Sequence, residues 1–218
     1  FEYMRWIAAV LDSHIQTHLN PDKLRLTHLG GGACSLARYC ADVYPNSRNT
    51  VVELDAKLAE YVREWFDIPK SPRVKIRVGD AGTVTRSFAP ASRDVVIRDV
   101  FAVDKTPAEL TSVDFVREVD HSMAPGGLYI LNCGDGPSLD GARAEVAALF
   151  EVFEQVCLVA DAAMLKGRRR CNIIIAASHS PLPAAGSAEA AAISRTLMGG
   201  GVPAQYRDSA QTRQFARL

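Results

Sequence analysis

The chain has 218 residues, of which 48% are hydrophobic and 23% are charged. This length is typical of one domain, or of one domain with an extension, and the composition is that of a folded globular protein rather than a disordered, collagen-like or disulfide-stapled chain. Lysine and arginine together number 25 and are balanced by 25 aspartates and glutamates, so the formal net charge is zero. Because a protein that binds nucleic acid needs a cation for each phosphate it neutralises, this balance argues against nucleic acid as a partner.

No segment of the sequence predicts export or membrane insertion. Apolar runs such as residues 173–177 are far shorter than the roughly 18 residues of a membrane-spanning helix. The chain starts at Phe1, and no basic segment followed by an apolar stretch and a small-residue cleavage site is visible there. We therefore expect a cytoplasmic protein without a membrane partner.

The cysteines and histidines do not have the spacing of metal ligands. The five cysteines are Cys34, Cys40, Cys133, Cys157 and Cys171. They form no Cys-x-x-Cys pair and have no histidine nearby at the spacing of a metal site, and the histidines form no cluster. Because several of the cysteines lie in apolar periodic segments, we expect reduced core residues, no catalytic cysteine and no metal site.

Strands and helices alternate along most of the chain. Short apolar or alternating runs predict strands, in order, over residues 24–29, 50–54, 74–78, 94–99, 128–132, 155–159 and 172–177. Three-and-four spacing of apolar residues predicts helices, in order, over residues 4–19, 36–43, 56–66, 110–123, 143–153 and 188–198. Residues 125–127, Pro-Gly-Gly, predict a tight turn before the fifth strand.

This alternation predicts a doubly wound α/β fold, because a crossover between parallel strands needs a connection of about helix length. We expect a mostly parallel sheet of seven strands whose last two form an antiparallel hairpin at the sheet edge. The arginines at 168–170, between those two strands, are expected to be solvated surface rather than an anion site. Residues 179–218 are rich in Ala, Ser, Gly and Pro and predict a C-terminal extension with a weakly structured end.

Glycines follow the first strand, at the edge where doubly wound sheets bind ligands. Gly30, Gly31 and Gly32 would let a ligand approach the backbone without meeting a β-carbon, although a plain turn into a helix is the alternative. The run lacks the final glycine of a dinucleotide fingerprint and the Gly-Lys-Ser of a phosphate loop. The run therefore predicts a loop that a ligand can approach but that does not form a phosphate cradle.

Acidic residues end the next two strands. Glu53 comes about 20 residues after the glycines, a position from which a carboxylate can accept hydrogen bonds from both ribose hydroxyls. Asp55 is an alternative for this role, but capping of the following helix is favoured for it. Asp80 can bond the exocyclic amine of an adenine or, equally, form an Asx-turn. Together with the glycines, these acids predict a site for an adenosine group.

Asp99 ends the most apolar strand and is followed by Val-Phe-Ala. There a carboxylate can orient and deprotonate an incoming amine, because a low dielectric strengthens its attraction for a cation. The alternative is a structural acid paired with Arg98 or Arg117. The position at a strand end favours the functional role.

Taken in order, these motifs resemble the spermidine synthase family of aminopropyltransferases, which has the methyltransferase-like nucleoside-binding fold. The resemblance spans about residues 1–178. The matching segments are residues 1–3 (FEY), 29–32 (LGGG), 52–55 (VELD), 78–81 (VGDA), 94–99 (DVVIRD), 106–110 (TPAEL), 114–115 (DF) and 124–127 (APGG). Residues 1–178 would then form a nucleoside-binding catalytic domain that starts with an amphipathic helix within residues 1–20.

The resemblance implies transfer of an aminopropyl group from decarboxylated S-adenosylmethionine to a diamine, with release of methylthioadenosine and without a metal. It implies that Asp99 holds and deprotonates the amine, that Glu53 binds ribose beside the glycine loop, and that Asp80 and Ala81 form the adenine turn. A small amine substrate and a homodimer follow from the same resemblance. The alternatives are a methyltransferase that uses S-adenosylmethionine in this pocket, and a non-catalytic protein that binds an adenosyl ligand.

Several positions depart from the family pattern. Ala33 stands where the family has an aspartate that binds the aminopropyl ammonium, and Ala102 stands where a second aspartate helps to seat the polyamine. Met4-Arg5 replaces a His-Glu pair, and the family's β-rich amino-terminal domain has no counterpart in the sequence. These departures make binding of an adenosyl group better supported than polyamine transfer.

Overall fold

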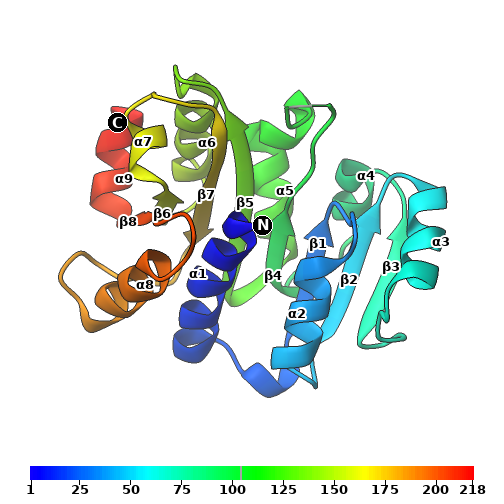
Figure 1. Ribbon diagram of the computed structural model, residues 1–218. Helices are drawn as coiled ribbons and strands as arrows, with labels where there is room; N and C mark the ends of the chain where they lie inside the picture. The colour runs from blue at the N-terminus through cyan, green and yellow to red at the C-terminus, as the bar shows by residue number, and fades with distance from the viewer. Residues whose placement is uncertain (104) are drawn as a thin grey trace.

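The computed structural model describes residues 1–103 and 105–218, without the side chain of Cys171. One β-sheet runs through the molecule, with helices on both of its faces (Figure 1). The strands are β1 (Arg25–Leu29), β2 (Arg48–Glu53), β3 (Val74–Val78), β4 (Arg93–Arg98), β5 (Met123–Asp135), β6 (Gln155–Ala160), β7 (Cys171–Ser178) and β8 (Gln205–Arg207). The α-helices are α1 (Glu2–His18), α2 (Ser35–Val43), α3 (Ala56–Trp65), α4 (Ala81–Arg86), α5 (Val113–Ser122), α6 (Asp140–Phe150), α7 (Ala162–Leu165), α8 (Ala188–Met198) and α9 (Ser209–Ala216). Two 3-10 turns, η1 (Pro21–Lys23) and η2 (Ala108–Thr111), precede β1 and α5.

The strands lie in the order β3-β2-β1-β4-β5-β7-β6-β8. The first five in this order pair in parallel, whereas β7 pairs antiparallel with both β5 and β6. The predicted doubly wound sheet with an antiparallel hairpin is therefore confirmed. The sheet of the described residues has eight strands rather than seven, because β8 pairs with β6 and moves the hairpin away from the edge.

The winding of the sheet reverses at β1, which has β2 on one side and β4 on the other. In this register Leu29 lies opposite Val52 and Arg98, the residues just before Glu53 and Asp99. The glycine loop and both acids therefore leave the sheet side by side. This is the crevice in which doubly wound sheets bind their ligands.

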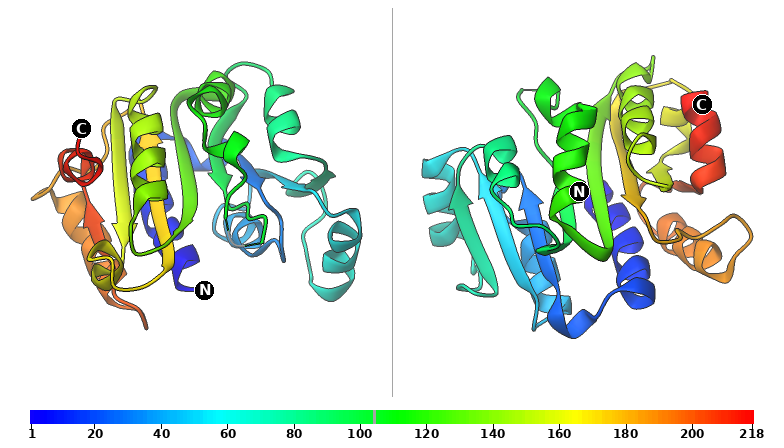
Figure 2. Two further views of the ribbon diagram at one scale, coloured as in Figure 1. Left: turned by 90° about the horizontal axis from the view of Figure 1, so that it is seen from above. Right: turned by 180° about the vertical axis from the view of Figure 1, so that it is seen from behind.

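Two layers of helices cover the sheet (Figure 2), and apolar residues fill the space between the sheet and each layer. One layer holds α1, α2, α3 and α8, and the other holds α4, α5, α6 and α9. The buried residues of α1 are Trp6, Ile7, Val10, Leu11, His14 and Ile15. Their three-and-four spacing confirms the amphipathic helix predicted at the start of the chain. Among the described residues, no helix combines the length and the apolar character needed to cross a membrane.

The prediction of a weakly structured chain end is wrong. β8 extends the sheet there, and α9 packs against α6 and β6. β8 has three residues, too few to show a periodic pattern. α9 starts with a capping box in which Asp208 accepts from the backbone of Gln211 while the Gln211 side chain accepts from the backbone of Asp208. This local signal for a helix start is present in the sequence, but apolar periodicity alone does not reveal it.

The turn predicted at residues 125–127 is also different in the structure. These residues belong to β5, which starts at Met123. Gly126 has a φ of +80°, and the pairing of β4 with β5 shifts register between Arg93 and Val95. The Pro-Gly-Gly segment therefore bends a continuous strand instead of separating a helix from it.

The four cysteines whose side chains are described are Cys34, Cys40, Cys133 and Cys157, and all four are free and buried. This confirms the expected reduced core residues, while Cys171 lies outside the described side chains. Burial raises the pKa of Cys40 and of Cys157 to about 12, so both thiols stay protonated near neutral pH. The arginines at 168–170 are exposed, as predicted.

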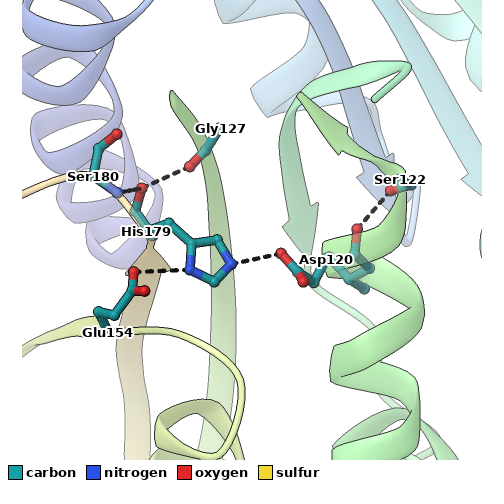
Figure 3. Close-up of polar contacts among 8 residues, drawn as sticks. Asp120, Ser122, Gly127, Glu154, His179 and Ser180 are labelled. Carbon is teal, nitrogen blue, oxygen red and sulfur yellow. Dashed lines mark hydrogen bonds and ion pairs between the residues drawn. The ribbon is translucent and has the colours of Figure 1, made fainter. Parts of the chain in front are cut away.

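His179, directly after β7, bridges two carboxylates (Figure 3). Its Nε2 lies 2.9 Å from Oδ1 of Asp120 on α5, and its Nδ1 lies 2.9 Å from Oε2 of Glu154. The ring also packs on Phe153, with 5.0 Å between the ring centroids. Burial opposes the charged ring, but the hydrogen bonds to the two carboxylates outweigh it and raise the pKa of His179.

Replacing Asp120 with Asn and Glu154 with Gln together is expected to lower the pKa of His179, because the charged ring then loses both anionic partners. Because the pKa of His179 is raised in the folded protein, its contacts with the two carboxylates stabilise the fold fully below the unfolded pKa of about 6.5. This stabilisation is lost as pH rises through the folded pKa. Since the ring is 47% exposed, we expect a contribution below about 1 kcal/mol. Proton NMR titration of the ring measures the pKa in both proteins. An equal pKa in the two would assign the shift to some other cause.

Candidate functional site

The glycine loop between β1 and α2 is shaped by the neighbouring strand ends. Gly30 has a φ of +89°, and a β-carbon at this position would overlap the backbone carbonyl oxygen of Asp99. At Gly31 a β-carbon would lie 3.0 Å from Oε2 of Glu53 and 3.0 Å from a methyl group of Val51. Gly32 has a φ of +46° and faces open space. Close packing therefore requires glycine at position 30 and leaves little room for a side chain at position 31, and Gly32 leaves the approach to the loop open.

Replacing Gly30 with Ala is expected to lower the free energy of unfolding by about 2 kcal/mol, because it adds a β-carbon at positive φ against a backbone carbonyl. Gly32→Ala is the matched control, since its φ is also positive but no atom lies within 4 Å of the added carbon. We expect a loss of at most about 1 kcal/mol in the control. Urea unfolding measures both. Equal losses would show that the contact with Asp99 contributes nothing.

Glu53, at the end of β2, binds the glycine loop itself. Its Oε2 accepts hydrogen bonds from the backbone N–H of Gly31 at 2.9 Å and of Gly32 at 3.0 Å. Its Oε1 accepts from the backbone N–H of Asp55 at 2.9 Å. A carboxylate has about four acceptor positions, so these three bonds leave about one for a ligand. Two ribose hydroxyls could both bind only if Glu53 releases a backbone N–H.

Asp55 and Asp80 both cap helices. Asp55 accepts from the backbone N–H of Lys57 at 2.8 Å and of Leu58 at 3.1 Å, which confirms its capping of α3. Asp80 accepts from the backbone N–H of Thr83 at 2.7 Å and starts α4, a helix that the strand pattern does not predict. Hydrogen bonds from the backbone and hydroxyl of Thr83 lower the pKa of Asp80, so the exposed carboxylate is ionised. Its role toward adenine stays a prediction.

Asp99, directly after β4, is held through both carboxylate oxygens. Oδ2 accepts a hydrogen bond from the hydroxyl of Tyr3 at 2.8 Å, and Oδ1 accepts from the side-chain amide of Asn132 at 2.9 Å. Burial and the negative charge of Asp99 raise the pKa of Tyr3, which keeps the phenol protonated as a donor. Since two of about four acceptor positions are used, Asp99 can still accept two hydrogen bonds from an amine.

Asp99 does not pair with Arg98 or Arg117, the partners of the structural alternative. Arg98 points away from it and binds Glu145, while Arg117 forms an exposed pair with Asp114. Adjacent residues of a strand face opposite sides of the sheet, which explains why Arg98 cannot reach its neighbour.

A cavity of about 200 Å³ lies at the glycine loop. Its lining includes all three glycines, Asp99, Tyr3 and the first turn of α2. Asp80, Ala81 and Glu53 do not line it, and Asp80 leaves the sheet at β3, three strand spacings of about 4.8 Å from β4. Because sites that enclose a whole ligand are about 300–1,000 Å³, this cavity can enclose only one end of a nucleoside-sized molecule.

The structure places three polar residues here to which the strand-end pattern assigns no role. Tyr3 and Asn132 hold Asp99, and His28 of β1 lines the cavity. Asn132 directly follows the apolar residues 128–131 within β5, and a polar amide at that position is a usable signal. His28 lies inside a predicted strand and nothing local marks it, whereas Tyr3 lies just before the periodic segment of residues 4–19, in the FEY segment that resembles the family.

The two positions at which the family has an aspartate carry small, uncharged side chains in this protein. Ala33 lines the cavity, so no side chain of the loop offers a carboxylate to a ligand there. Ala102 is exposed and pairs through its backbone with Lys105. Asp99 is the only acidic side chain among the described residues that line the cavity.

No family model matches the chain. Among solved structures, it is similar to a probable spermidine synthase from Corynebacterium glutamicum, with 59% identity and a TM-score of 0.97 over 99% of this chain and 77% of that one. It is also similar to human methyltransferase-like protein 13 in complex with SAH, with 25% identity and a TM-score of 0.71 over 92% of this chain and 94% of that one. These similarities confirm the methyltransferase-like fold that the sequence predicts.

Among curated proteins, the chain is 31% identical over 141 residues to the mouse eEF1A lysine and N-terminal methyltransferase, covering 60% of this chain and 20% of that protein. It is 28% identical over 130 residues to a probable polyamine aminopropyl transferase of Bifidobacterium longum, covering 56% of this chain and 28% of that protein. The chain thus spans about a fifth of the length of the mouse relative it matches. Its relatives are transferases of two kinds, one for aminopropyl groups and one for methyl groups.

Proposed function

Because the chain belongs to the spermidine synthase family, we propose that it transfers an aminopropyl group from decarboxylated S-adenosylmethionine to a small amine such as a diamine. The observation that carries the proposal is the placement of Asp99 at the cavity of the glycine loop, with one oxygen held by Tyr3 and the other by Asn132. A carboxylate fixed in this way keeps two acceptor positions in a set direction. An ammonium group is the ligand that such positions fit.

In the proposed reaction, Asp99 first holds the acceptor amine as its ammonium form. An alkylamine has a pKa near about 10.4, so it arrives protonated at neutral pH and must lose a proton before it can act as a nucleophile. Asp99 takes this proton before the new carbon–nitrogen bond forms, and later passes it to water. When bound, decarboxylated S-adenosylmethionine supplies the carbon next to a sulfonium, whose sulfur keeps the electron pair of the broken bond and leaves as methylthioadenosine.

Tyr3 and Asn132 keep Asp99 in one orientation, which contributes positioning rather than proton transfer. The cavity walls beside Asp99 include the apolar side chains of Leu29, Val51 and Ile97. Water excluded by these side chains no longer solvates the amine, so its attraction to the carboxylate is stronger than in solution.

We assign the remaining predicted site residues to the nucleoside part of the ligand. We propose that Gly30, Gly31 and Gly32 allow its close approach, and that Glu53 accepts from ribose after giving up one loop N–H. Asp80 and the backbone of Ala81 would bind adenine at the end of β3. Since the cavity holds only one end of the ligand, the adenine and ribose would lie outside it along this edge of the sheet.

Methyl transfer from S-adenosylmethionine is the second candidate. It is favoured by Ala33, which leaves the loop without a carboxylate for an aminopropyl ammonium, and by the identity to the mouse methyltransferase. The same Asp99 would then orient an amine that receives a methyl group. Binding of an adenosyl ligand without turnover is the remaining alternative. The expected homodimer, the cytoplasmic location, the lack of nucleic-acid and membrane partners, and the division at residue 178 stay predictions.

Two measurements separate these candidates. Thermal shift with decarboxylated S-adenosylmethionine, S-adenosylmethionine and methylthioadenosine is expected to show stabilisation by the first and third, because a ligand that binds only the folded state raises its stability. Incubation of the decarboxylated compound with putrescine is then expected to yield methylthioadenosine and spermidine, detected by chromatography. A methylated amine formed from S-adenosylmethionine would favour the second candidate. Stabilisation by none of the three compounds would rule out both aminopropyl transfer and methyl transfer.

A further inference from the structure

His28 is a buried histidine at the cavity that the proposed mechanism does not use. It lies on β1, two residues before Gly30, and it is 4% exposed. Its Nε2 is hydrogen-bonded to Oδ1 of Asn49 at 2.9 Å. Within residues 1–103 and 105–218, its Nδ1 has no hydrogen-bond partner. Because leaving a buried polar atom unpaired costs stability, this nitrogen needs an explanation.

The hydrogen bonds of Asn49 fix which nitrogen of His28 carries the proton. The carbonyl oxygen of Arg73 can only accept, so the Asn49 atom 3.0 Å from it must be the amide nitrogen. The same amide group donates to the hydroxyl oxygen of Ser47 at 2.9 Å. Oδ1 of Asn49 therefore faces His28 and accepts from Nε2–H. In the neutral ring, Nδ1 is then an acceptor with a free lone pair.

The ring stays neutral near pH 7, because burial lowers the pKa of His28 to about 4 and outweighs the hydrogen bond to Asn49. The cavity beside it suits a short alkyl chain that ends in a donor. Its walls include the apolar side chains of Ala37, Val51 and Ile97, and no lysine or arginine side chain lies among its described lining residues. A cationic group can enter without meeting a like charge from these side chains.

We propose that Nδ1 of His28 accepts a hydrogen bond from the terminal ammonium of the aminopropyl chain of the co-substrate. This inference rests on the proposed function, which brings two amino groups to one end of the site. Asp99 holds the acceptor amine, so the ammonium of the transferred chain needs another acceptor. The loop supplies no carboxylate for it, because residue 33 is alanine. A neutral imidazole takes this position and leaves the negative charge of Asp99 to the acceptor amine.

The test compares two thioethers that differ in one group: 5′-deoxy-5′-(3-aminopropylthio)adenosine and 5′-deoxy-5′-(propylthio)adenosine. Calorimetric titration of the parent protein is expected to show tighter binding of the aminopropyl compound. In His28→Leu this preference is expected to fall by about 10- to 100-fold, the effect of one hydrogen bond to a charged group. Affinity for the propyl compound is expected to change little, which also shows that the variant is folded.

Asp99→Asn is the comparison variant, and it is expected to keep the preference for the aminopropyl compound. If Asp99→Asn abolishes the preference and His28→Leu keeps it, the ammonium binds Asp99 and the inference is wrong. If the parent binds both compounds equally, the inference is wrong while the proposed function stands. If the parent binds neither compound, the proposed function fails as well.

Nitrogen-15 NMR of the parent protein provides a readout that needs no substitution at His28. Without ligand, Nε2 is expected to carry the proton and Nδ1 to resonate as an unprotonated nitrogen. The aminopropyl compound is expected to move the Nδ1 signal toward lower frequency, and the propyl compound is expected to leave it in place. A protonated Nδ1 in the free protein, or equal shifts with the two compounds, would overturn the inference.

Discussion

Replacing Asp99 with Asn is expected to lower the turnover number for aminopropyl transfer by about 10²- to 10⁴-fold, because an amide has no negative charge to hold an ammonium and does not take its proton. The substitution preserves shape. The new side-chain oxygen can accept from Asn132, and the hydroxyl of Tyr3 can accept from the new amide group instead of donating. Initial rates of methylthioadenosine formation at saturating decarboxylated S-adenosylmethionine measure the effect.

The matched control for this substitution is Asp114→Asn. Asp114 is an exposed acid whose partner is Arg117, three residues along α5, so the control removes the same charge from a solvated pair. We expect the control to keep the parent rate. A full rate in Asp99→Asn would remove Asp99 from the mechanism. A loss explained entirely by weaker binding of the nucleoside would move its role from proton transfer to ligand binding.

Much of this site could be predicted because its features are local along the chain. A strand, a run of glycines and a helix follow one another without a gap, so Gly30, Gly31 and Gly32 could be placed at a strand end from spacing alone. Glu53 and Asp99 could be placed in the same way, since each follows a run of apolar strand residues. Parallel strands then bring these ends to one edge of the sheet.

Contacts between distant segments could not be predicted. Tyr3 and Asp99 are 96 residues apart, and their hydrogen bond depends on where α1 packs against the sheet. The sequence also does not show whether an acidic side chain at a strand end binds a ligand or binds backbone N–H groups. Glu53 binds the loop N–H groups and Asp80 caps α4, although each stands where a nucleoside acid was expected. Only the three-dimensional arrangement shows which backbone donors are within reach.

Arg98 connects the core to the site, because it lies next to Asp99 but faces the other side of the sheet. Its guanidinium is 1% exposed and binds the carboxylate of Glu145, a residue of α6 whose side chain is 7% exposed. It also donates to the backbone carbonyl of Leu110, after the loop that follows Asp99. Removing one member of such a pair leaves the other charged and buried, which costs far more than the pair itself contributes.

Replacing Arg98 with Met is therefore expected to lower the free energy of unfolding by about 3–5 kcal/mol at pH 7. The double variant Arg98→Met with Glu145→Leu is expected to recover most of this loss, because it leaves no charge without a partner. Urea unfolding of both variants and the parent measures the effect. In the single variant, the carboxylate of Glu145 stays buried without its cationic partner, which is the cause of the expected loss. If the single and double variants are equally unstable, the loss comes from packing around the guanidinium and not from the unpaired carboxylate.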